Sequence, residues 1–287
     1  MNFRSTEQLL RDGKALFAKG PVALVFVEDD IAVEETLAHQ VAAGFAEVIA
    51  FIGPDVSLPD VIAERVHRVS WNSARDQDAV EIVNACVAKA PGTWFYYCFN
   101  AEFLFFPFCE TRSVGEMIAF SKEERRDTIL TYVVDLYADD LDAFPNAVSL
   151  DHAYLDRSGY YALARTDAQS NVLDRQMDFY GGLRWRMEEH IPKKRRKIDR
   201  VALFKSKPGL KLFEDHTFND PEYNTYSCPW HHNITAAICS FRTAKALKRN
   251  PGSTYDIETF RWHNSVKFEW KSQQLMELGL MEPGQWF

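Results

Sequence analysis

The sequence predicts an α/β fold in which a mostly parallel sheet is flanked by helices, with a less regular C-terminal half. Short runs of apolar, β-branched and aromatic residues recur before residue 100, as is typical of strands buried on both faces. Stretches with apolar residues at helical spacing separate these runs. This β-α-β alternation favours parallel strands joined by crossover helices.

The elements of the first half follow from these patterns. The run VALVFV is apolar throughout, and the runs EVIAFIG and TWFYYCF are apolar after their first residue. The segment after the first run reaches Gly44, and the third helical segment ends at Pro91-Gly92, both of which can end a helix. The expected strands are 22–27, 47–53, 67–71 and 93–99, and the expected helices are 32–45, 58–66 and 75–92.

The second half gives weaker patterns. A strong strand pattern over 128–140 runs into acidic residues, and the polar stretch 141–178 is predicted to be a long loop region. The remaining expectations are a strand pair at 200–205 and 209–215, a last strand at 234–241, and one or two helices within 255–280. No internal repeat or convincing linker divides the chain, so a single domain over 1–287 is expected.

Composition restricts the class of protein. The chain has 287 residues, of which 46% are apolar and 26% charged, and its net charge of −8 disfavours nucleic-acid binding. It contains no apolar run of membrane-spanning length, and its N-terminus lacks the apolar core of a secretory signal. The five cysteines form no CxxC pair. We therefore expect a cytoplasmic protein.

Glu102 is the most conspicuous residue of the first half, because it lies in the apolar stretch YYCFNAEFLFFPFC. Removing water from an isolated carboxylate is costly, so the residue is either a satisfied polar group at a strand end or the rim of an active site. Ligands of open α/β sheets bind beyond the carboxyl ends of the strands. The position of Glu102 just after such an end favours the active-site reading.

The stretch 101–140 resembles the bacterial family 2-like glycosyltransferases. Glu102-Phe103-Leu104 matches the end of their Asp-x-Asp-Glu-Phe-Leu motif, residues 109–113 match their Cys-Glu-Thr-Arg-Ser segment, and residues 135–137 match their Leu-Asp-Met-Tyr strand in part. Downstream, YGGLRWR at 180–186, KIDRVALFK at 197–205 and His216 are similar to later family segments.

The resemblance implies a GT-A fold, a nucleotide-sugar donor and a glycan or polysaccharide acceptor. Residues 1–140 would then form a nucleotide-binding half, and 141–287 an acceptor half with C-terminal helices. The chain is accordingly expected to be a glycosyltransferase of the hexosyltransferase type, acting in polysaccharide biosynthesis. The alternative is a catalytically inactive relative that binds a glycan or nucleotide, or scaffolds an active partner.

The metal-binding positions of the family differ in this chain. Alignment on Glu102 places Phe99 and Ala101 where the family has aspartates that hold a divalent ion, and neither residue can bind one. Only Asn100 and Glu102 offer oxygen nearby, and Ser240 stands where a candidate histidine ligand would be. No metal ligand is therefore assigned, and Mn²⁺ or Mg²⁺ is expected only if the Glu102 site is retained.

Several side chains are candidates for donor binding, each with a plainer alternative. Carboxylates at strand ends can accept hydrogen bonds from a base or ribose, but acidic residues also begin helices. Arg112 could bind a phosphate through two parallel bonds, or pair with Glu110. The donor-binding candidates are Glu28, Asp55, Asn100, Glu102, Arg112 and Lys205.

An inverting transfer needs a base for the acceptor hydroxyl. The catalytic candidates are Asp135, Asp215 and His216. The basic run from Lys193 to Lys197 is either a solvated loop, a diphosphate site or a peripheral membrane contact with anionic headgroups. His231 and His232, beside Trp230, are weak candidates for metal ligands because adjacent side chains point apart.

Overall fold

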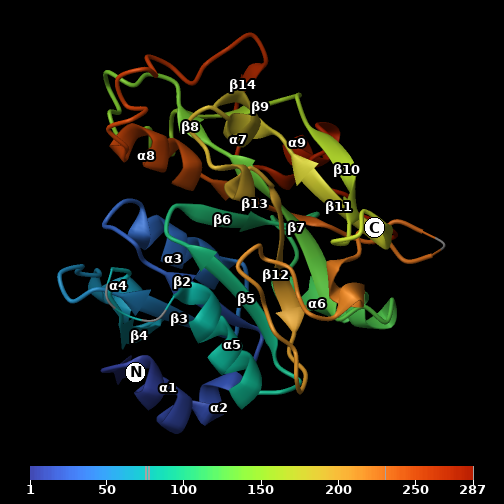
Figure 1. The fold of residues 1–287 in the computed structure, drawn as a ribbon. Helices are drawn as coiled ribbons and strands as arrows, with labels where there is room; N and C mark the ends of the chain where they lie inside the picture. The colour runs from blue at the N-terminus through green and yellow to red at the C-terminus, as the bar shows by residue number, and fades with distance from the viewer. Residues whose placement is uncertain (75, 77, 230, 287) are drawn as a thin grey trace. The chain divides into compact units, whose positions relative to one another are not determined.

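A computed structural model describes residues 1–74, 76, 78–229 and 231–286 (Figure 1). It confirms an α/β fold with a large, mostly parallel sheet flanked by helices. The chain divides into two compact units, each assembled from separate segments. The first unit comprises Met1–Leu104, Thr111–Ile129 and Val201–Asn224, and the second comprises Phe105–Glu110, Leu130–Arg200 and Thr225–Phe287. The chain thus passes between the units several times.

The first unit is built on a sheet with strand order β1-β4-β3-β2-β5-β12. Neighbouring strands from β1 to β5 run parallel, and β12 is antiparallel to β5. All residues of β2, β3 and β5 are buried, which explains their continuous apolar sequences. The strands are β1 (Asn2–Phe3), β2 (Val22–Phe26), β3 (Glu47–Ile52), β4 (His67–Ser70), β5 (Trp94–Phe99), β6 (Glu102–Phe105) and β12 (Asp199–Lys205).

Helices connect the parallel strands of the first unit. The connections through α3 and α4 lead from β2 to β3 and then to β4, toward one edge of the sheet. The connection through α5 leads back across the sheet from β4 to β5. Right-handed crossovers therefore put α5 on the opposite face from α3 and α4. The α1 helix packs against α5 (Figure 1). The helices are α1 (Thr6–Asp12), α2 (Lys14–Phe17), α3 (Val33–Ala42), α4 (Asp60–Ala63), α5 (Ala79–Lys89), α6 (Val114–Glu123) and the 3-10 turn Pro221–Asn224.

The second unit contains three groups of strands. The β7 strand continues into this unit and pairs in parallel with β13, so that Asp135 lies beside Ser240. A three-stranded antiparallel sheet has the order β14-β9-β8, and β10 and β11 form a two-stranded ribbon. The strands are β7 (Thr128–Asp135), β8 (Tyr137–Ala138), β9 (Ala153–Asp156), β10 (Tyr161–Thr166), β11 (Val172–Tyr180), β13 (Ala236–Ser240) and β14 (Ser265–Lys267).

Short helices complete the second unit and enclose an apolar core. They are α7 (Gly182–Arg186), the 3-10 turn Lys193–Arg195, α8 (Arg242–Arg249) and α9 (Ser272–Glu277). The core cluster includes Tyr137, Leu183, Leu247 and Phe260. Among the residues that the structure describes, none of the helices has the length and apolarity that a membrane crossing requires.

The strands and helices expected in the first half are confirmed, although the third helix begins at Ala79 rather than 75, and positions 75 and 77 lie outside the described residues. The expected loop region 141–178 is wrong, since it contains β9, β10 and most of β11. The expected strand at 209–215 is also wrong: Leu212 makes only an isolated bridge with Phe218. The strand expected at 234–241 is confirmed as β13, but it is not the last strand, because β14 follows it. Within 255–280, where one or two helices were expected, only Ser272–Glu277 is helical.

Candidate functional site

Three of the predicted donor-binding residues, Glu28, Asp55 and Asn100, follow strands that end at the carboxyl edge of the first unit's sheet. The register aligns Phe26 with Phe51 and with Phe99, so the loops that follow these three strands begin at one edge. Glu28 follows β2, Asp55 follows β3 and Asn100 follows β5. The ring of Phe26 stacks on that of Phe51, with centroids 4.7 Å apart. Beneath the polar loops, this edge is therefore a packed aromatic layer.

Asn100 fastens the loop that follows β2. Its Oδ1 accepts a hydrogen bond from the Glu28 N–H at 2.9 Å. Its Nδ2 donates to the carboxylate of Asp29 at 2.7 Å and to the carbonyl of Ile31 at 2.9 Å. The residue is completely buried. Both ends of this amide are thus used to hold backbone in place, and its oxygen is directed at an N–H.

Glu102 is a satisfied polar group at the start of β6. It is buried, and its carboxylate accepts a hydrogen bond from the Phe99 N–H at 3.0 Å. Ala101, which lies between Phe99 and Glu102 in the chain, adopts a left-handed conformation with φ of 63°. Its N–H donates to Thr36 Oγ1 at 2.8 Å. The side chain of Phe99 packs on Phe26, with ring centroids 5.9 Å apart. Ala101 therefore forms part of a tight turn, and Phe99 is part of the apolar core.

These residues do not fit a divalent metal ion. Mg²⁺ requires several oxygen ligands in near-octahedral geometry, usually including one or two carboxylates. Here the Glu102 carboxylate is buried on a backbone N–H, and the amide of Asn100 is used to hold the neighbouring loop, including the Asp29 carboxylate.

The other donor-binding candidates are distributed unevenly. Glu28 is half-buried at the carboxyl edge, and Asp55 is exposed there. Arg112 is half-buried just before α6. The pKa of Glu116 is lowered mainly by two hydrogen bonds from Ser113, and the charge of Arg112 lowers it further. The predicted donor-binding residue Lys205 does not lie at the carboxyl edge. It pairs with Trp94 at the amino end of β5 and forms an ion pair with Asp127 at 3.3 Å. It lies at the opposite end of β5 from Asn100.

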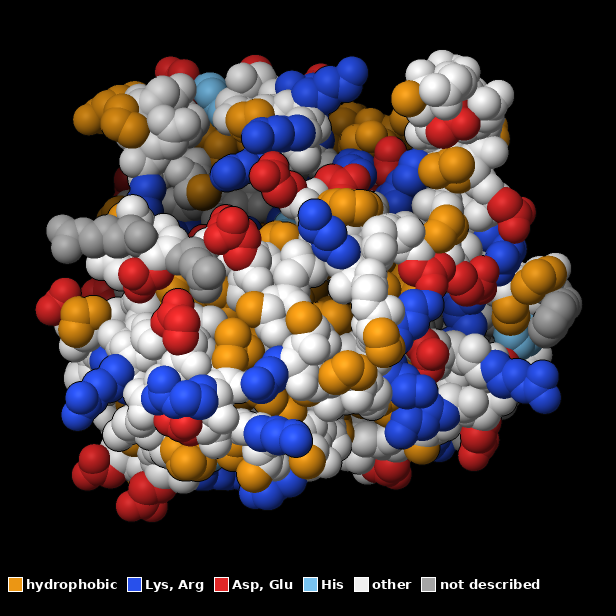
Figure 2. Space-filling view, turned by 60° about the horizontal axis from the view of Figure 1, so that its bottom comes forward, with side chains coloured by type: hydrophobic (Ala, Val, Ile, Leu, Met, Phe, Trp, Pro, Cys, Tyr) orange, Lys and Arg blue, Asp and Glu red, His pale blue; other side chains and the backbone are white. Residues whose placement is uncertain are grey.

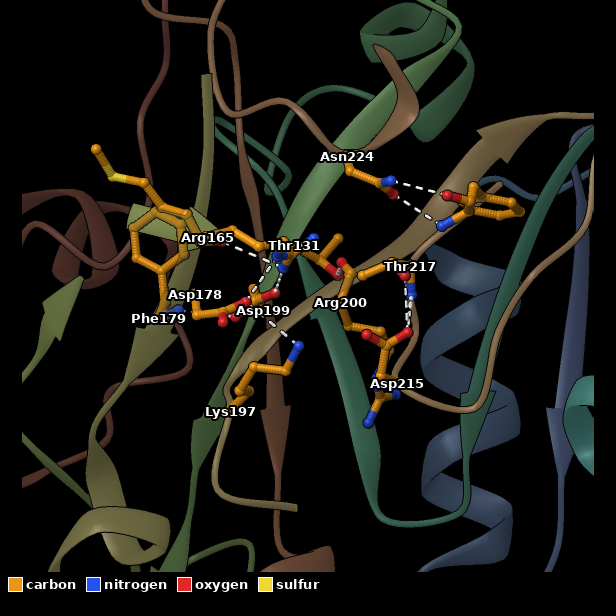
Figure 3. A network of polar contacts seen from close by, with 12 residues as sticks. Thr131, Arg165, Asp178, Phe179, Lys197, Asp199, Arg200, Asp215, Thr217 and Asn224 are labelled. Atoms are coloured by element: carbon orange, nitrogen blue, oxygen red, sulfur yellow. Dashed lines mark hydrogen bonds and ion pairs between the residues drawn. The ribbon is translucent and has the colours of Figure 1, made fainter. Parts of the chain in front are cut away.

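Asp215 and His216 occupy a turn in the first unit. The Asp215 carboxylate accepts from the N–H and hydroxyl of its neighbour Thr217, as the close view shows (Figure 3). The Nδ1 atom of His216 lies 3.0 Å from the hydroxyl of Tyr97, and the two rings stack. His216 itself has a left-handed backbone with φ of 63°. Both side chains have local structural partners.

In the second unit, Asp135 lies at the carboxyl end of β7 with its side chain fully buried. Its Oδ2 accepts a hydrogen bond from the Arg184 N–H at 3.2 Å, and its Oδ1 lies 3.4 Å from Arg184 Nε. Burial raises the pKa of the Asp135 carboxyl, and the Arg184 charge opposes that shift only in part. Burial in this site therefore favours the protonated form of the Asp135 carboxyl, as a group that accepts a proton requires.

A double glycine brings the segment before α7 close to Asp135. Gly181 and Gly182 have φ of 157° and 61°, and a Cβ added to Gly182 would lie 3.1 Å from Asp135 Oδ2. A Cβ at Gly181 would collide with the ring of Tyr160. The glycines therefore permit the close approach that aligns the Arg184 N–H with the carboxylate. The sequence match of Tyr-Gly-Gly-Leu-Arg gave no indication of this contact with Asp135.

A second buried carboxylate, Asp156, fixes the surroundings of Asp135. Arg186 binds it through Nε at 2.8 Å and through a terminal nitrogen at 3.1 Å. The Tyr137 hydroxyl and the Trp262 indole N–H also donate to it, at 2.5 and 2.7 Å. The guanidinium of Arg186 lies 4.8 Å from the Trp262 ring centroid. Sequence reasoning missed Asp156 because its partners are distant in the chain.

The basic run is partly used inside the second unit. Lys197 pairs with Asp178 at 3.3 Å, and Arg165 bridges Asp178 and Asp199, both at 2.7 Å (Figure 3). Arg196 pairs with Glu188 at 2.8 Å. Residues 193–195 are exposed. On the face drawn in Figure 2, acidic and basic side chains are interspersed.

The two adjacent histidines have different surroundings. His231 lies against the thiol of Cys228, while the His232 ring is 6.4 Å from that of Tyr226. Trp230 lies outside the described residues. The two histidines thus have different neighbours, and the weak prediction that they are metal ligands stays a prediction.

Comparisons with known proteins do not place this chain in a family. No protein-family model matches the sequence. No curated protein matches it either.

Proposed function

We propose that the chain is a glycosyltransferase-like protein that transfers a sugar from a nucleotide-sugar donor to a glycan or polysaccharide acceptor. One observation carries the proposal. Two segments similar to family motifs, the Asp135 strand end and the Gly181–Arg184 turn, meet at the Asp135 carboxylate, although Asp135 and Arg184 are 49 residues apart in the chain. A buried carboxylate held by an arginine is the kind of group that can deprotonate an acceptor hydroxyl.

In the proposed reaction, the acceptor oxygen forms a bond to the anomeric carbon of the sugar. The bond from that carbon to the donor phosphate breaks, and a nucleoside diphosphate leaves. Asp135 takes the acceptor proton, and Arg184 orients the carboxylate. Glu28 and Asp55 are assigned to the base or ribose, and Arg112 to the diphosphate charge. Among the three base candidates, Asp135 is favoured because Asp215 and His216 are engaged by Thr217 and Tyr97.

A second candidate function is binding without turnover. The observation that favours it is the use of Phe99, Asn100 and Ala101 for packing and loop support at the position of the family's metal site. A protein that has lost donor activation would still hold a nucleotide or a glycan. It would act as a binding or scaffolding partner of an active enzyme.

The test is release of nucleoside diphosphate from a panel of nucleotide sugars, with a mixed glycan acceptor pool and with or without Mn²⁺. We expect turnover with at least one donor, a loss of about 100-fold or more in Asp135→Asn, and no loss in the control Asp151→Asn, which alters an exposed aspartate of the same unit. Thermal stabilisation by a nucleotide without turnover would favour the binding protein. Turnover that is unchanged in Asp135→Asn would refute the assigned base.

A further inference from the structure

Tyr160 carries an unusual hydroxyl next to the Asp135 site. The oxygen is buried and makes no hydrogen bond with any residue that the structure describes. Its ring is held against Gly181, where even a methyl group would collide with it. Buried polar atoms in proteins almost always have a partner, and leaving one unpaired is costly. No hydrogen bond within the described residues accounts for this hydroxyl, which makes it a candidate for contact with a ligand.

The surroundings of Tyr160 define the chemistry of that ligand. Burial raises the pKa of the phenol well above its ordinary value, and the charges of Asp156 and Asp135 raise it further. The phenol is thus a protonated donor that can also accept. Gly181 and Gly182, which separate the Tyr160 ring from the Asp135 carboxylate, bring a neutral hydroxyl and a carboxylate to one turn. This combination suits a ligand with hydroxyl groups.

A partly exposed indole lies close to the residue that precedes Tyr160. Gly159, which precedes Tyr160, has φ of 92°, and a Cβ built on it would lie 3.0 Å from the ring of Trp185 and 3.8 Å from that of Trp262. Trp185 is 39% exposed, whereas Trp262 is fixed by Asp156 and Arg186. A rigid aromatic surface beside buried polar groups presents an apolar face and hydrogen-bonding groups together.

We propose that this part of the second unit binds a saccharide, with Tyr160 holding one of its hydroxyl groups beside Asp135 and Trp185 packing against a sugar ring. A saccharide supplies hydroxyl groups that can bond to the Tyr160 phenol and an apolar C–H face that can pack on the Trp185 ring. The inference rests on the proposed function in taking the acceptor to be a glycan. It adds two recognition residues that sequence reasoning did not find, and it does not require turnover.

The experiment is saturation-transfer NMR of the full chain with glucose, galactose, mannose and N-acetylglucosamine, in the absence of nucleotide. We expect at least one sugar to bind, with affinity falling about fivefold in Tyr160→Phe and about tenfold in Trp185→Ala. Tyr160→Phe keeps the ring that packs on Gly181, so the fold is retained. The control is Tyr255→Ala, which removes an aromatic side chain that is 87% exposed. This control should bind like the wild type.

The outcomes separate the inference from the proposed function. Absence of binding by all four sugars, or binding that neither Tyr160→Phe nor Trp185→Ala weakens, would overturn the inference. Sugar binding that depends on both residues in a protein without transferase turnover would support the inference and refute the enzyme. Turnover that depends on Asp135 but not on Tyr160 or Trp185 would support the enzyme and refute the inference.

Discussion

The carboxyl edge of the first unit's sheet and the Asp135 site of the second unit both contain buried polar side chains, but they use them differently. At the first edge, the Asn100 amide bonds to Glu28, Asp29 and Ile31 of a neighbouring loop. At the second site, a phenol is buried without such a bond, and a carboxyl is held in a setting that raises its pKa. Burial alone therefore does not identify a functional residue, because the hydrogen-bond partners decide its role.

The largest effect on stability is expected at the first edge. Asn100→Ala removes the side chain that holds the 28–31 loop and leaves the Glu28 N–H without its acceptor. We expect the free energy of unfolding to fall by about 3 kcal/mol, measured by urea denaturation. The control Asn171→Ala, at an exposed turn, should cost less. A loss equal to that of the control would mean that the Asn100 network has no structural role, contrary to the comparison.

The next effect concerns the pH dependence of stability at Asp135. A carboxyl whose pKa is raised on folding favours the protonated folded state. Its contribution is complete below the unfolded pKa of about 3.9 and is lost as pH rises through the folded value. Relative to Asp135→Asn, which does not titrate, the wild type should therefore lose stability as pH increases above about 4. Urea denaturation across pH 4–8 checks this, and the opposite slope would show that Arg184 outweighs burial.

The two regions also differ in how far the sequence could predict them. The first sheet was predictable because Val22–Phe26 and Trp94–Phe99 are buried on both faces and hence apolar throughout. The ribbon of β10 was not, since residues 161–164 are exposed and its sequence shows no buried face. Asp135 could be singled out as a carboxylate ending a strand. The partnership of Asn100 with residues some 70 positions away, and that of Asp135 with Arg184, arise only from tertiary structure.

Two tyrosines of the second unit should respond to loss of the hydroxyl with opposite signs. The Tyr137 hydroxyl donates to Asp156 and lies 2.7 Å from Ser265 Oγ, whereas the Tyr160 hydroxyl is buried with no bond to the described residues. We expect Tyr137→Phe to lower the free energy of unfolding by about 1.5 kcal/mol and Tyr160→Phe to raise it slightly. Thermal denaturation of both variants without ligand measures this. Destabilisation by Tyr160→Phe would show that its hydroxyl serves the fold.

The smallest effect tests the segment similar to Cys-Glu-Thr-Arg-Ser. Its residues divide between the units, with Glu110 in the second and Arg112 in the first. The Glu110 carboxylate accepts hydrogen bonds from the N–H and hydroxyl of Ser272, at 2.5 and 2.7 Å. Burial acts to raise the pKa of Glu110, but these bonds outweigh it and the pKa is lowered. Ser272, rather than Arg112, is therefore expected to be the residue that stabilises the Glu110 charge.

A lowered carboxyl pKa gives stability that is present above the unfolded value of about 4.3 and is lost as pH falls through the folded value. Ser272→Ala removes the hydroxyl bond, so it should cost less than about 1 kcal/mol at pH 7 and progressively less as the pH is lowered below about 4.3. The measurement is urea denaturation from pH 7 to pH 3, with Ser57→Ala as an exposed control. If instead Arg112→Gln, and not Ser272→Ala, reduced the acid sensitivity, Glu110 would depend on Arg112. The segment would then be held by an ion pair, as the alternative reading of its sequence proposed.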